Sequence, residues 1–407
     1  MKHFINLFKR AIGLIRTKGF KGAFAVVKEM DNQMDIPGFY GYIMDDKKIE
    51  FADGEREELE KSSVTILNWV IPEMGIGSGG HINIFRFVQK LQNMGFQNRV
   101  YIFNSNALDS DQSFINFINQ YYDLDTEKIE LHYDVAGMKP AHAVIATSWQ
   151  TAYYVRKFDK VISKFYFVQD FEPFFYAVGS EYTFAENTYR FGFRGLTAGD
   201  WLKDILRDEY GMKTESFSFS YDKDVYHAID KKDDTKRLFF YARPVTPRRA
   251  FELGLLALVE VAKKIPDVEV IFAGWDVSGY RIPFNYKNAG SVKVEELSDI
   301  YSQCDMCLIL SNTNLSLLPL EVMASNSVAV CTKGPNSTWL VNEDNSIMVD
   351  FDPIAISDTL CYYLNNRDEL SKIRKKGLEF ALATSWDDEA AKVRDAIMRG
   401  IKEDGEK

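Results

Sequence analysis

Two arginines and one glutamate carry the clearest chemical signal in this chain of 407 residues. Arg243 and Arg248 lie five residues apart in the segment RLFFYARPVTPRRAFEL, and Glu321 follows Pro319 in LPLEVMASNSVA. Each segment joins an apolar, strand-like run to a helical pattern. Guanidinium groups bind phosphate oxygens through a rigid fork of donors, and a carboxylate accepts hydrogen bonds from ribose hydroxyls. Together these residues indicate a site for a nucleoside diphosphate.

A glycine-rich turn, GIGSGGHIN at residues 75–83, lies between a predicted strand and a helical pattern that Gly95 closes. Its glycines let the backbone approach a ligand, and the helix N-terminus presents unpaired N–H groups to an anion. The letters fit GxGxxG, but the next strand ends with no acid for a ribose, so the dinucleotide fingerprint is incomplete. The turn either brings the backbone at Gly75, Gly77, Gly79 and Gly80 to an anionic ligand, with His81 donating to a phosphate or a sugar hydroxyl, or is a tight turn in which His81 has a capping or core role.

A second loop after a predicted strand, YFVQDFEPFFYAVGSEY at residues 166–182, contains two acids beside several aromatic residues. In an extended segment Asp170 and Glu172 would point to the same side. Carboxylates next to rings suit a saccharide, because rings cover its apolar face and acids accept its hydroxyls. The alternative is a solvated loop with incidental acids. We favour a site, because loops after parallel strands are where such folds bind ligands; TSWQ at residues 147–150 occupies an equivalent edge.

From residue 63 onward, strand-like runs alternate with helical patterns, which predicts parallel βαβ units in an α/β fold. Two sets of runs predict two doubly wound, Rossmann-like domains, separated by the polar stretch YDKDVYHAIDKKDD. The strands predicted for the first set are Val64–Val70, Arg99–Phe103, His142–Ala146, Phe165–Val168 and Gly195–Ala198. Those predicted for the second set are Leu238–Tyr241, Val268–Ala273, Met306–Leu310, Val328–Cys331 and Ile347–Val349.

The N-terminus differs in composition from the rest of the chain. Residues 1–30 carry seven basic residues against one acid and show apolar positions near helical spacing, whereas residues 31–61 are acidic and polar. The basic helix either lies on the inner face of the cytoplasmic membrane or packs on the protein with a solvated basic face. We predict a helical extension and linker at 1–62, domains at 63–222 and 223–385, and a C-terminal helix at 386–407 that crosses back to the first domain.

Composition limits the remaining functional classes. The net charge of −10 argues against binding nucleic acid, because such proteins are normally basic. No apolar run reaches the roughly 18 residues of a membrane span. Cys304 and Cys307 form a CDMC pair, but no second pair or nearby histidine completes a zinc site. We therefore predict a cytoplasmic protein with buried free thiols and no bound metal.

Between about Val64 and Trp386, several motifs recur in the order found in one known family. They are GSGGH, QDFEP, AGDWL, YDKDVY, YARPVTPRR, NAGSVKVEELSDIYSQCDMCLILS, LPLEVMASNSVAV, NSIMVDFDP and TSWDDEA. By these motifs the chain resembles the GT-B glycosyltransferases of family 4 and is most like the bacterial rhamnosyltransferase WsaF group. The resemblance implies the GT-B fold, in which two Rossmann-like domains face a cleft.

The resemblance also implies roles for individual residues. Those it assigns to the sugar donor are Gly79 and Gly80 facing the phosphates, Arg243 and Arg248 on the diphosphate, Val292 and Lys293 contacting the base through their backbone, and Glu321 on the ribose.

Three positions depart from the family. The first glutamate of its E-x7-E motif would fall at Thr313, one histidine falls at Thr147, and the histidine of its HD pair is Gln169. The family's use of a histidine to handle the acceptor therefore does not apply to this chain, and Asp170 or Glu172 must be considered for that role instead.

For the reaction, the resemblance implies retention of anomeric configuration without a metal or cofactor, with the released diphosphate taking the acceptor proton. We predict a rhamnosyltransferase that uses dTDP-rhamnose and a saccharide or lipid-linked glycan acceptor to build a bacterial surface polysaccharide. Its expected catalytic residues are Asp170, Glu172 and His81. The alternatives are transfer of galactofuranose or a UDP-hexose, a non-catalytic nucleotide-sugar-binding protein, and a Rossmann oxidoreductase. The missing ribose-binding acid after the glycine turn argues against the last of these.

Overall fold

The structure is a computed structural model that describes residues 35–406. The chain falls into two compact units, divided between Lys47 and Lys48. The described part of the first unit holds helix α2 (Ile36–Tyr40) and the 3-10 helix η1 (Gly41–Ile43). The basic helix predicted within residues 1–30, with its proposed membrane contact, lies outside the described residues.

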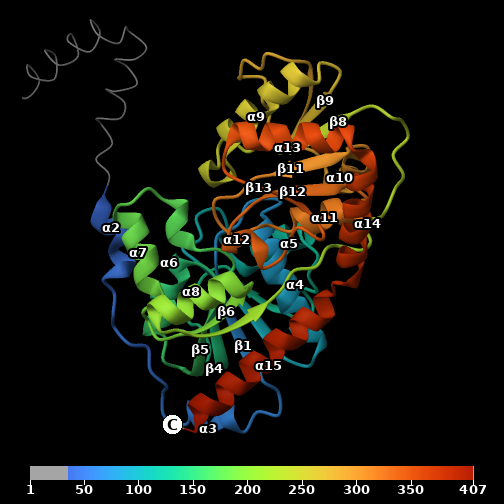
Figure 1. Cartoon of the computed structure of the whole chain (residues 1–407). Helices are drawn as coiled ribbons and strands as arrows, with labels where there is room; N and C mark the ends of the chain where they lie inside the picture. Colours follow the sequence, from blue (N-terminus) through green and yellow to red (C-terminus); the bar gives the residue numbers. More distant parts are fainter. Residues whose placement is uncertain (1–34, 407) are drawn as a thin grey trace, which may run out of the picture. The chain divides into compact units, whose positions relative to one another are not determined.

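The first domain of the larger unit is built on a seven-stranded sheet in which all strand pairs are parallel (Figure 1). The strand order is β3-β2-β1-β4-β5-β6-β7. The strands are β1 (Ile66–Pro72), β2 (Gln97–Phe103), β3 (Glu130–His132), β4 (Ala141–Ala146), β5 (Val161–Val168), β6 (Arg194–Ala198) and β7 (Lys213–Phe217). Strand order reverses between β1 and β4, so their carboxyl ends form the switch point where such sheets bind ligands.

Helices cover this sheet, and the last helix of the chain is one of them. The helices of the domain are α3 (Glu55–Glu60), α4 (Gly79–Asn93), α5 (Asp111–Tyr121), α6 (Trp149–Lys157), η2 (Glu172–Phe175), α7 (Ser180–Thr188) and α8 (Asp200–Tyr210). Helix α15 (Trp386–Gly405) packs against β5, β7 and α4. Phe87, Phe167, Phe217 and Trp386 meet there with ring centroids 4.7–5.9 Å apart. Burial of such rings, worth about 1.5–3 kcal/mol each, holds α15 on the first domain.

The second domain is built on a six-stranded parallel sheet in the order β10-β9-β8-β11-β12-β13. Its strands are β8 (Arg237–Tyr241), β9 (Glu269–Ala273), β10 (Tyr286–Gly290), β11 (Met306–Ile309), β12 (Val328–Thr332) and β13 (Ile347–Val349). Strand order reverses between β8 and β11, which places the switch point of this sheet at their carboxyl ends. Two doubly wound parallel sheets in one chain confirm the predicted α/β fold class.

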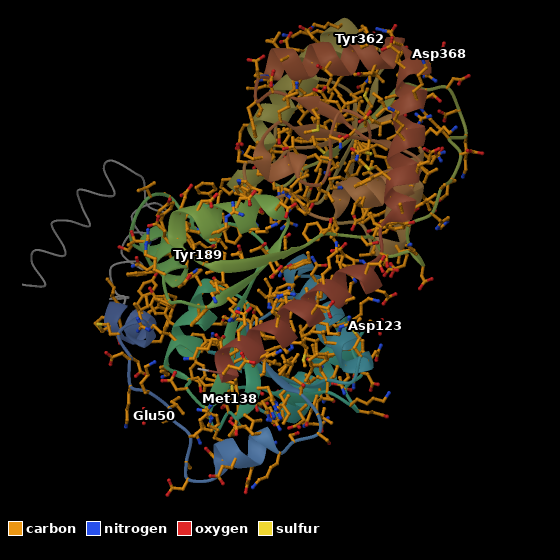
Figure 2. The ribbon with its side chains drawn as sticks, turned by 60° about the horizontal axis from the view of Figure 1, so that its bottom comes forward. Glu50, Asp123, Met138, Tyr189, Tyr362 and Asp368 are labelled. Atoms are coloured by element: carbon orange, nitrogen blue, oxygen red, sulfur yellow. The ribbon has the colours of Figure 1, made fainter. Side chains whose placement is uncertain are left out.

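Helices lie on both faces of the second sheet. They are η3 (Pro247–Arg249), α9 (Phe251–Lys264), α10 (Val294–Ser302), α11 (Leu318–Ala324), α12 (Pro335–Thr338), α13 (Pro353–Asn365) and α14 (Arg367–Ala383). Helices α9 and α13 pack together on one face, and α11 lies on the other with α14 against it (Figure 1). A buried aliphatic and aromatic core fills the α9–α13 side. Polar and aromatic residues such as Asp368 and Tyr362 lie on the outer surface (Figure 2).

Every predicted strand is present, and three further strands are found at sheet edges. These three, β3, β7 and β10, are short or alternate between exposed and partly buried residues, so they lack the apolar run that marks a central strand. The larger compact unit begins at Lys48, whereas the first Rossmann-like domain was predicted to begin at residue 63. Within this segment Ile49 exchanges backbone hydrogen bonds with the chain around Phe158, and Leu59 is buried against Ile66 and Ala141.

The four cysteines are free thiols. Cys304, Cys307 and Cys331 are buried, as predicted, and Cys361 is half-buried. Burial raises the pKa of the Cys331 thiol to about 12. A thiol protonated at neutral pH is chemically inert, so Cys331 has a packing role.

Candidate functional site

The predicted phosphate and ribose residues lie on either side of the switch point of the second sheet. Arg243 and Arg248 follow β8, and Glu321 lies in the first turn of α11, the helix that follows β11. Pro319 is the second residue of this helix, a position in the first turn where its missing N–H costs nothing. The Asn312 amide donates to the Arg248 carbonyl at 2.8 Å, so the two loops are bonded to each other.

Arg248 reaches from its loop to the first domain. Its Cζ lies 4.2 Å from the centroid of the Phe175 ring. Its Nε lies 3.9 Å from Asp170 Oδ2, too far for a hydrogen bond, and is buried with no hydrogen-bond partner. Burial lowers the pKa of Arg248, and so does the neighbouring Arg249, although a guanidinium keeps its charge. A half-buried cation with a buried, unsatisfied donor is well suited to an anionic ligand.

The other two arginines of this segment have different partners. Arg243 Nη1 donates to the Gly274 carbonyl at 3.3 Å, which joins it to the loop after β9. Arg249 Nη1 donates to Ser311 Oγ at 2.8 Å and thereby supports the loop after β11. The Arg249 guanidinium thus has a short hydrogen bond within the protein, whereas Arg243 makes one long hydrogen bond to a backbone carbonyl.

Asp170, which follows first-domain strand β5, is held by the second-domain loop after β11. Thr313 Oγ1 donates to Asp170 Oδ2 at 2.8 Å, and the Asn314 amide donates to Oδ1 at 2.9 Å. Burial raises the pKa of the Asp170 carboxyl, while the Asn314 hydrogen bond, the Arg249 charge and the Thr313 hydrogen bond oppose that rise. Asp170 therefore lies against the loops that carry the predicted sugar-donor residues.

Asn314 makes several hydrogen bonds at the boundary between the two domains. Its Nδ2 donates to the carbonyls of Gln169 and Ala198, both at 2.9 Å, and its Oδ1 accepts from Trp339 Nε1 at 2.7 Å. The Trp339 indole also covers Gly199, where a Cβ would fall 2.3 Å from the ring and φ is +91°. These contacts fix the loop after β11 to the carboxyl ends of β5 and β6.

One face of α4 continues the site from the glycine turn. The Gly80 carbonyl accepts from Gln169 Nε2 at 3.0 Å, and Asn83 Nδ2 donates to Gln169 Oε1 at 3.3 Å. One turn later, Arg86 Nη1 donates to Asn83 Oδ1 at 2.7 Å. Spacings of three residues place all three positions on one side of the helix. Gln169 thus links the glycine turn to the loop that carries Asp170.

Glu321 and Arg86 belong to one charged cluster. Burial raises the pKa of the Glu321 carboxyl to about 7, against a hydrogen bond with Tyr226 and the positive charge of Arg86. Burial lowers the pKa of Arg86, and the charges of Asp222 and Glu321 oppose that decrease. The Arg86 guanidinium also lies over the Trp386 ring, 4.5 Å from its centroid. The first domain therefore supplies a cation beside the predicted ribose acceptor.

Glu172 and His81 point into the first domain instead. Glu172 starts η2, so the chain is not extended here, and the expectation that Asp170 and Glu172 share one side is wrong. Glu172 accepts from the Trp149 amide (2.9 Å) and the Tyr166 hydroxyl (2.8 Å), and burial raises its pKa to about 7.

His81 is bonded on both ring nitrogens. Its Nδ1 lies 2.8 Å from Ser78 Oγ and its Nε2 lies 3.1 Å from the Pro72 carbonyl. Burial lowers the pKa of His81, so the neutral ring donates from Nε2 and accepts at Nδ1. This arrangement supports the glycine turn, and a catalytic role for His81 stays a prediction.

The predicted base contacts lie at the carboxyl edge of the second sheet. Lys293 caps α10 at its N-terminus, and half-buried Val292 precedes it, shortly after β10 ends at Gly290. The Gly290 carbonyl accepts from the Gly274 amide at 2.8 Å, so this loop adjoins the loop after β9. Gly79 opens α4 with free space where a Cβ would be.

Several residues of the site were not predicted from the sequence. Arg86 and Asn314 act across the boundary between the domains, Asn83 links Arg86 to Gln169 within the first domain, and Tyr226 lies in a polar stretch that was interpreted as a linker. Arg86 has a local signal, since it lies six residues after Gly80 on the same helix face. Asn314 has none, because its partners are far away in the sequence.

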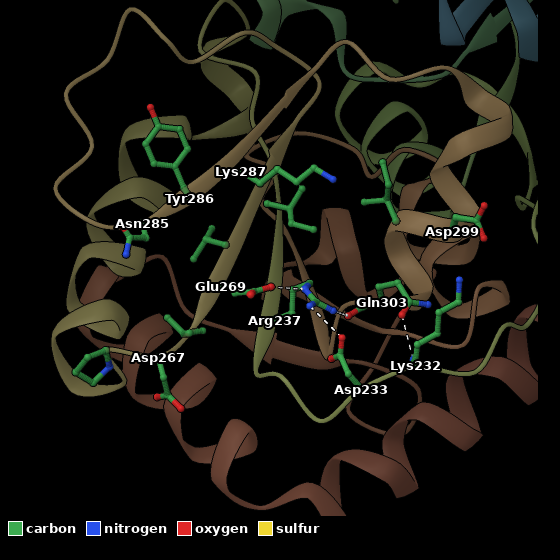
Figure 3. Close-up of a pocket in the computed structure, with 15 residues that line it drawn as sticks. Lys232, Asp233, Arg237, Asp267, Glu269, Asn285, Tyr286, Lys287, Asp299 and Gln303 are labelled. Carbon is green, nitrogen blue, oxygen red and sulfur yellow. Dashed lines mark hydrogen bonds and ion pairs between the residues drawn. The ribbon is translucent and has the colours of Figure 1, made fainter.

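A cavity of about 770 Å³ lies at the other end of the second sheet (Figure 3). Arg237 and Glu269, the first residues of β8 and β9, line it, so it opens at the amino ends of the strands. Arg237 is bonded there to Glu269 (2.8 Å), Asp233 (3.4 Å) and the Gln303 carbonyl (2.9 Å). The charges of Arg237, Asp233 and Glu269 are thus paired with one another, and the cavity is separate from the candidate site.

Within residues 35–406, no helix is long and apolar enough to cross a bilayer. In the same part of the chain, no group of three His, Cys, Asp or Glu side chains is arranged to hold a metal ion.

Comparison with known sequences shows that the second domain is similar to a described family. A family model described as "WsaF, C-terminal domain" matches residues 236–361, which run from β8 into α13. The O-antigen biosynthesis protein RfbC of Myxococcus xanthus is 29% identical over 354 residues, or 85% of this chain. The match covers 28% of that relative, so the chain spans little more than a quarter of its length.

Comparison with solved structures identifies the fold. A sucrose-phosphate synthase from Thermosynechococcus elongatus matches with a TM-score of 0.62 and 11% identity, covering 82% of this chain and 98% of the other. Anabaena HepE in complex with UDP matches with a TM-score of 0.62 and 12% identity, covering 84% and 100%. WaaG, a glycosyltransferase involved in lipopolysaccharide biosynthesis, matches with a TM-score of 0.59 and 13% identity, covering 82% and 99%. The chain has the GT-B fold.

Proposed function

We propose that this chain is a glycosyltransferase of family 4 that takes a sugar from a nucleoside diphosphate and helps to build an O-antigen-type polysaccharide. One observation carries the proposal: two arginines and a glutamate flank the switch point between β8 and β11. Parallel sheets bind nucleotides at such points. The similarity to an O-antigen biosynthesis protein and to a UDP complex supports the same assignment.

In the proposed reaction the protein binds the diphosphate and stabilises it as a leaving group. Arg243 and Arg248, whose buried Nε has no hydrogen-bond partner, offset the negative charge that develops as the bond from the anomeric carbon to the diphosphate oxygen breaks. The acceptor oxygen bonds to that carbon on the same face, and its proton passes to the released diphosphate. Configuration is therefore retained, and the two arginines supply the charge compensation that a metal ion would otherwise give.

Glu321 is the proposed acceptor of hydrogen bonds from the ribose, and Gly79 and Gly80 lie at the helix N-terminus that would face the phosphates. Val292 and Lys293 are the proposed backbone contacts to the base. Asp170 lies within this set through Thr313 and Asn314, so we place it on the sugar-donor side of the reaction rather than on the acceptor side predicted from sequence.

The proposed sugar is rhamnose, carried by dTDP. Position 313, where the family has a glutamate, holds a buried threonine that is already bonded to Asp170. A site without that carboxylate suits a sugar with fewer hydroxyls. Half-buried Leu317 remains near the start of α11, while Leu315 and Leu318 are packed inside. Contact with the rhamnose methyl group would contribute about 0.8 kcal/mol.

A binding and turnover screen tests the proposal. Thermal shift with dTDP, UDP and their sugar derivatives would identify a ligand, because binding stabilises the folded state by mass action. A competition among dTDP-rhamnose, dTDP-glucose and UDP-glucose, with sugar release measured by mass spectrometry, should favour dTDP-rhamnose. Preference for a UDP-hexose would remove the rhamnose assignment and leave the diphosphate site intact. Binding without any turnover would favour a non-catalytic nucleotide-sugar-binding protein.

A further inference from the structure

Trp275 is an exposed aromatic residue at the edge of the proposed nucleotide site. It comes two residues after β9 ends at Ala273, at the carboxyl edge of the second sheet. Trp275 is 39% exposed, whereas the other five tryptophans, all within the described residues, are buried or half-buried. Exposure of a large ring at a ligand-binding edge is unfavourable in water and is typical of a binding surface.

The residues on both sides of Trp275 are hydrogen-bonded to β10, Gly274 through its backbone and Asp276 through its side chain. Gly274 donates to the Gly290 carbonyl at 2.8 Å, and Asp276 Oδ1 accepts from Asn288 Nδ2 at 2.6 Å, so both neighbours are tied to β10. Gly274 has φ of +104° and passes so close to Tyr241 that a Cβ would fall 2.8 Å from its ring. The indole is thus presented by a well-braced loop, which limits the conformational entropy lost on binding.

The neighbours of this loop are residues already proposed to bind the nucleotide. Arg243 Nη1 donates to the Gly274 carbonyl at 3.3 Å, on the side of the phosphates. Gly290 lies directly before the loop of Val292 and Lys293, on the side of the base. The loop that carries Trp275 is therefore hydrogen-bonded to the proposed phosphate contact, Arg243, and to Gly290, which precedes the proposed base contacts.

We propose that Trp275 stacks on the nucleobase of the sugar donor and so contributes to recognition of the nucleotide. The inference rests on the proposed function and adds a residue to it. A planar base and an indole expose flat π-faces, and stacking of a base on an aromatic side chain tolerates different bases. Trp275 therefore serves dTDP and UDP alike, and the choice between them falls to other groups.

Calorimetric titration with dTDP tests the stacking. Trp275→Ala should weaken dTDP binding about 5- to 100-fold, on the scale of one stacked base, and Trp275→Phe should recover part of the loss. Tyr362→Ala is the matched control, since Tyr362 is an exposed aromatic on the outer face of α13 (Figure 2), and it should bind dTDP as the wild type does. Thermal melting of each variant checks that the fold is retained.

A second titration, with inorganic pyrophosphate, separates stacking from general support of the loop. Pyrophosphate has no base, so wild type and Trp275→Ala should bind it equally. Equal weakening of dTDP and pyrophosphate would overturn the proposal, and so would unchanged dTDP binding in Trp275→Ala. In the latter case the proposed function stands, because wild type still binds dTDP. A wild-type protein that binds no nucleoside diphosphate contradicts the proposed function and the stacking together.

Discussion

The proposed ribose contact of Glu321 predicts a specific pH dependence of nucleotide binding. Burial raises the pKa of this carboxyl to about 7 in the ligand-free protein. The ionised form is the better acceptor of ribose hydroxyls, so a bound ribose lowers the pKa and binding releases protons. Affinity should therefore rise as pH increases toward 7 and level off above it.

The size of the effect follows from the ionised fraction. With a pKa of about 7, roughly one tenth of Glu321 is ionised at pH 6 and roughly nine tenths at pH 8. The dissociation constant of a nucleotide sugar should thus be about tenfold higher at pH 6 than at pH 8. Glu321→Gln removes the titration, so its profile should lose this tenfold change. At pH 8 it should bind more weakly than wild type by about 1–3 kcal/mol, the loss expected for hydrogen bonds to a charged group.

Calorimetry with an intact nucleotide sugar is the suitable assay, because a diphosphate diester has no group that titrates between pH 6 and 8. Glu172 also has a pKa of about 7, but it titrates in both proteins and cancels in the comparison. A flat wild-type profile, or a tenfold change that persists in Glu321→Gln, would refute the reasoning.

Three further predictions follow from the contacts around the site. Arg86→Met should move the midpoint of the pH profile above that of wild type, because the Arg86 charge lowers the pKa of Glu321; an unmoved midpoint would contradict the contact between the domains. Arg248→Ala should lower sugar transfer about 10²–10³-fold, the scale of one transition-state donor, while Arg399→Ala, which removes an exposed guanidinium, should leave it unchanged. The Tm of Glu172→Gln, measured relative to the Tm of wild type at the same pH, should be higher at pH 8 than at pH 5. The folded protein favours the protonated acid, so wild type loses that stability as pH rises through about 7, and glutamine does not. An equal difference in Tm at both pH values would show that Glu172 does not titrate in this range.

Central strands and their loops could be predicted from the sequence because their signals are local. A strand buried on both faces is an apolar run, and every such run was identified. The edge strands β3, β7 and β10 are partly exposed, so composition does not mark them. The positions of Arg243, Arg248 and Glu321 follow from the strand-to-helix segments that hold them.

The cross-domain part of the site could not be predicted, since it depends on distant partners. Asp170 is bonded to Thr313 and Asn314, residues more than a hundred positions away. The expected pairing of Asp170 with Glu172 assumed an extended chain, but η2 begins at Glu172 with Pro173 in its first turn, and Glu172 turns inward. Alternation of side chains holds only while a segment stays extended.

A crystal structure of the protein with dTDP is the most direct test of the central claim. The account predicts a diphosphate within hydrogen-bond distance of Arg243 and Arg248, with the ribose hydroxyls on Glu321. Binding of dTDP at the glycine turn of the first domain, or in the cavity at the amino ends of β8 and β9, would contradict it.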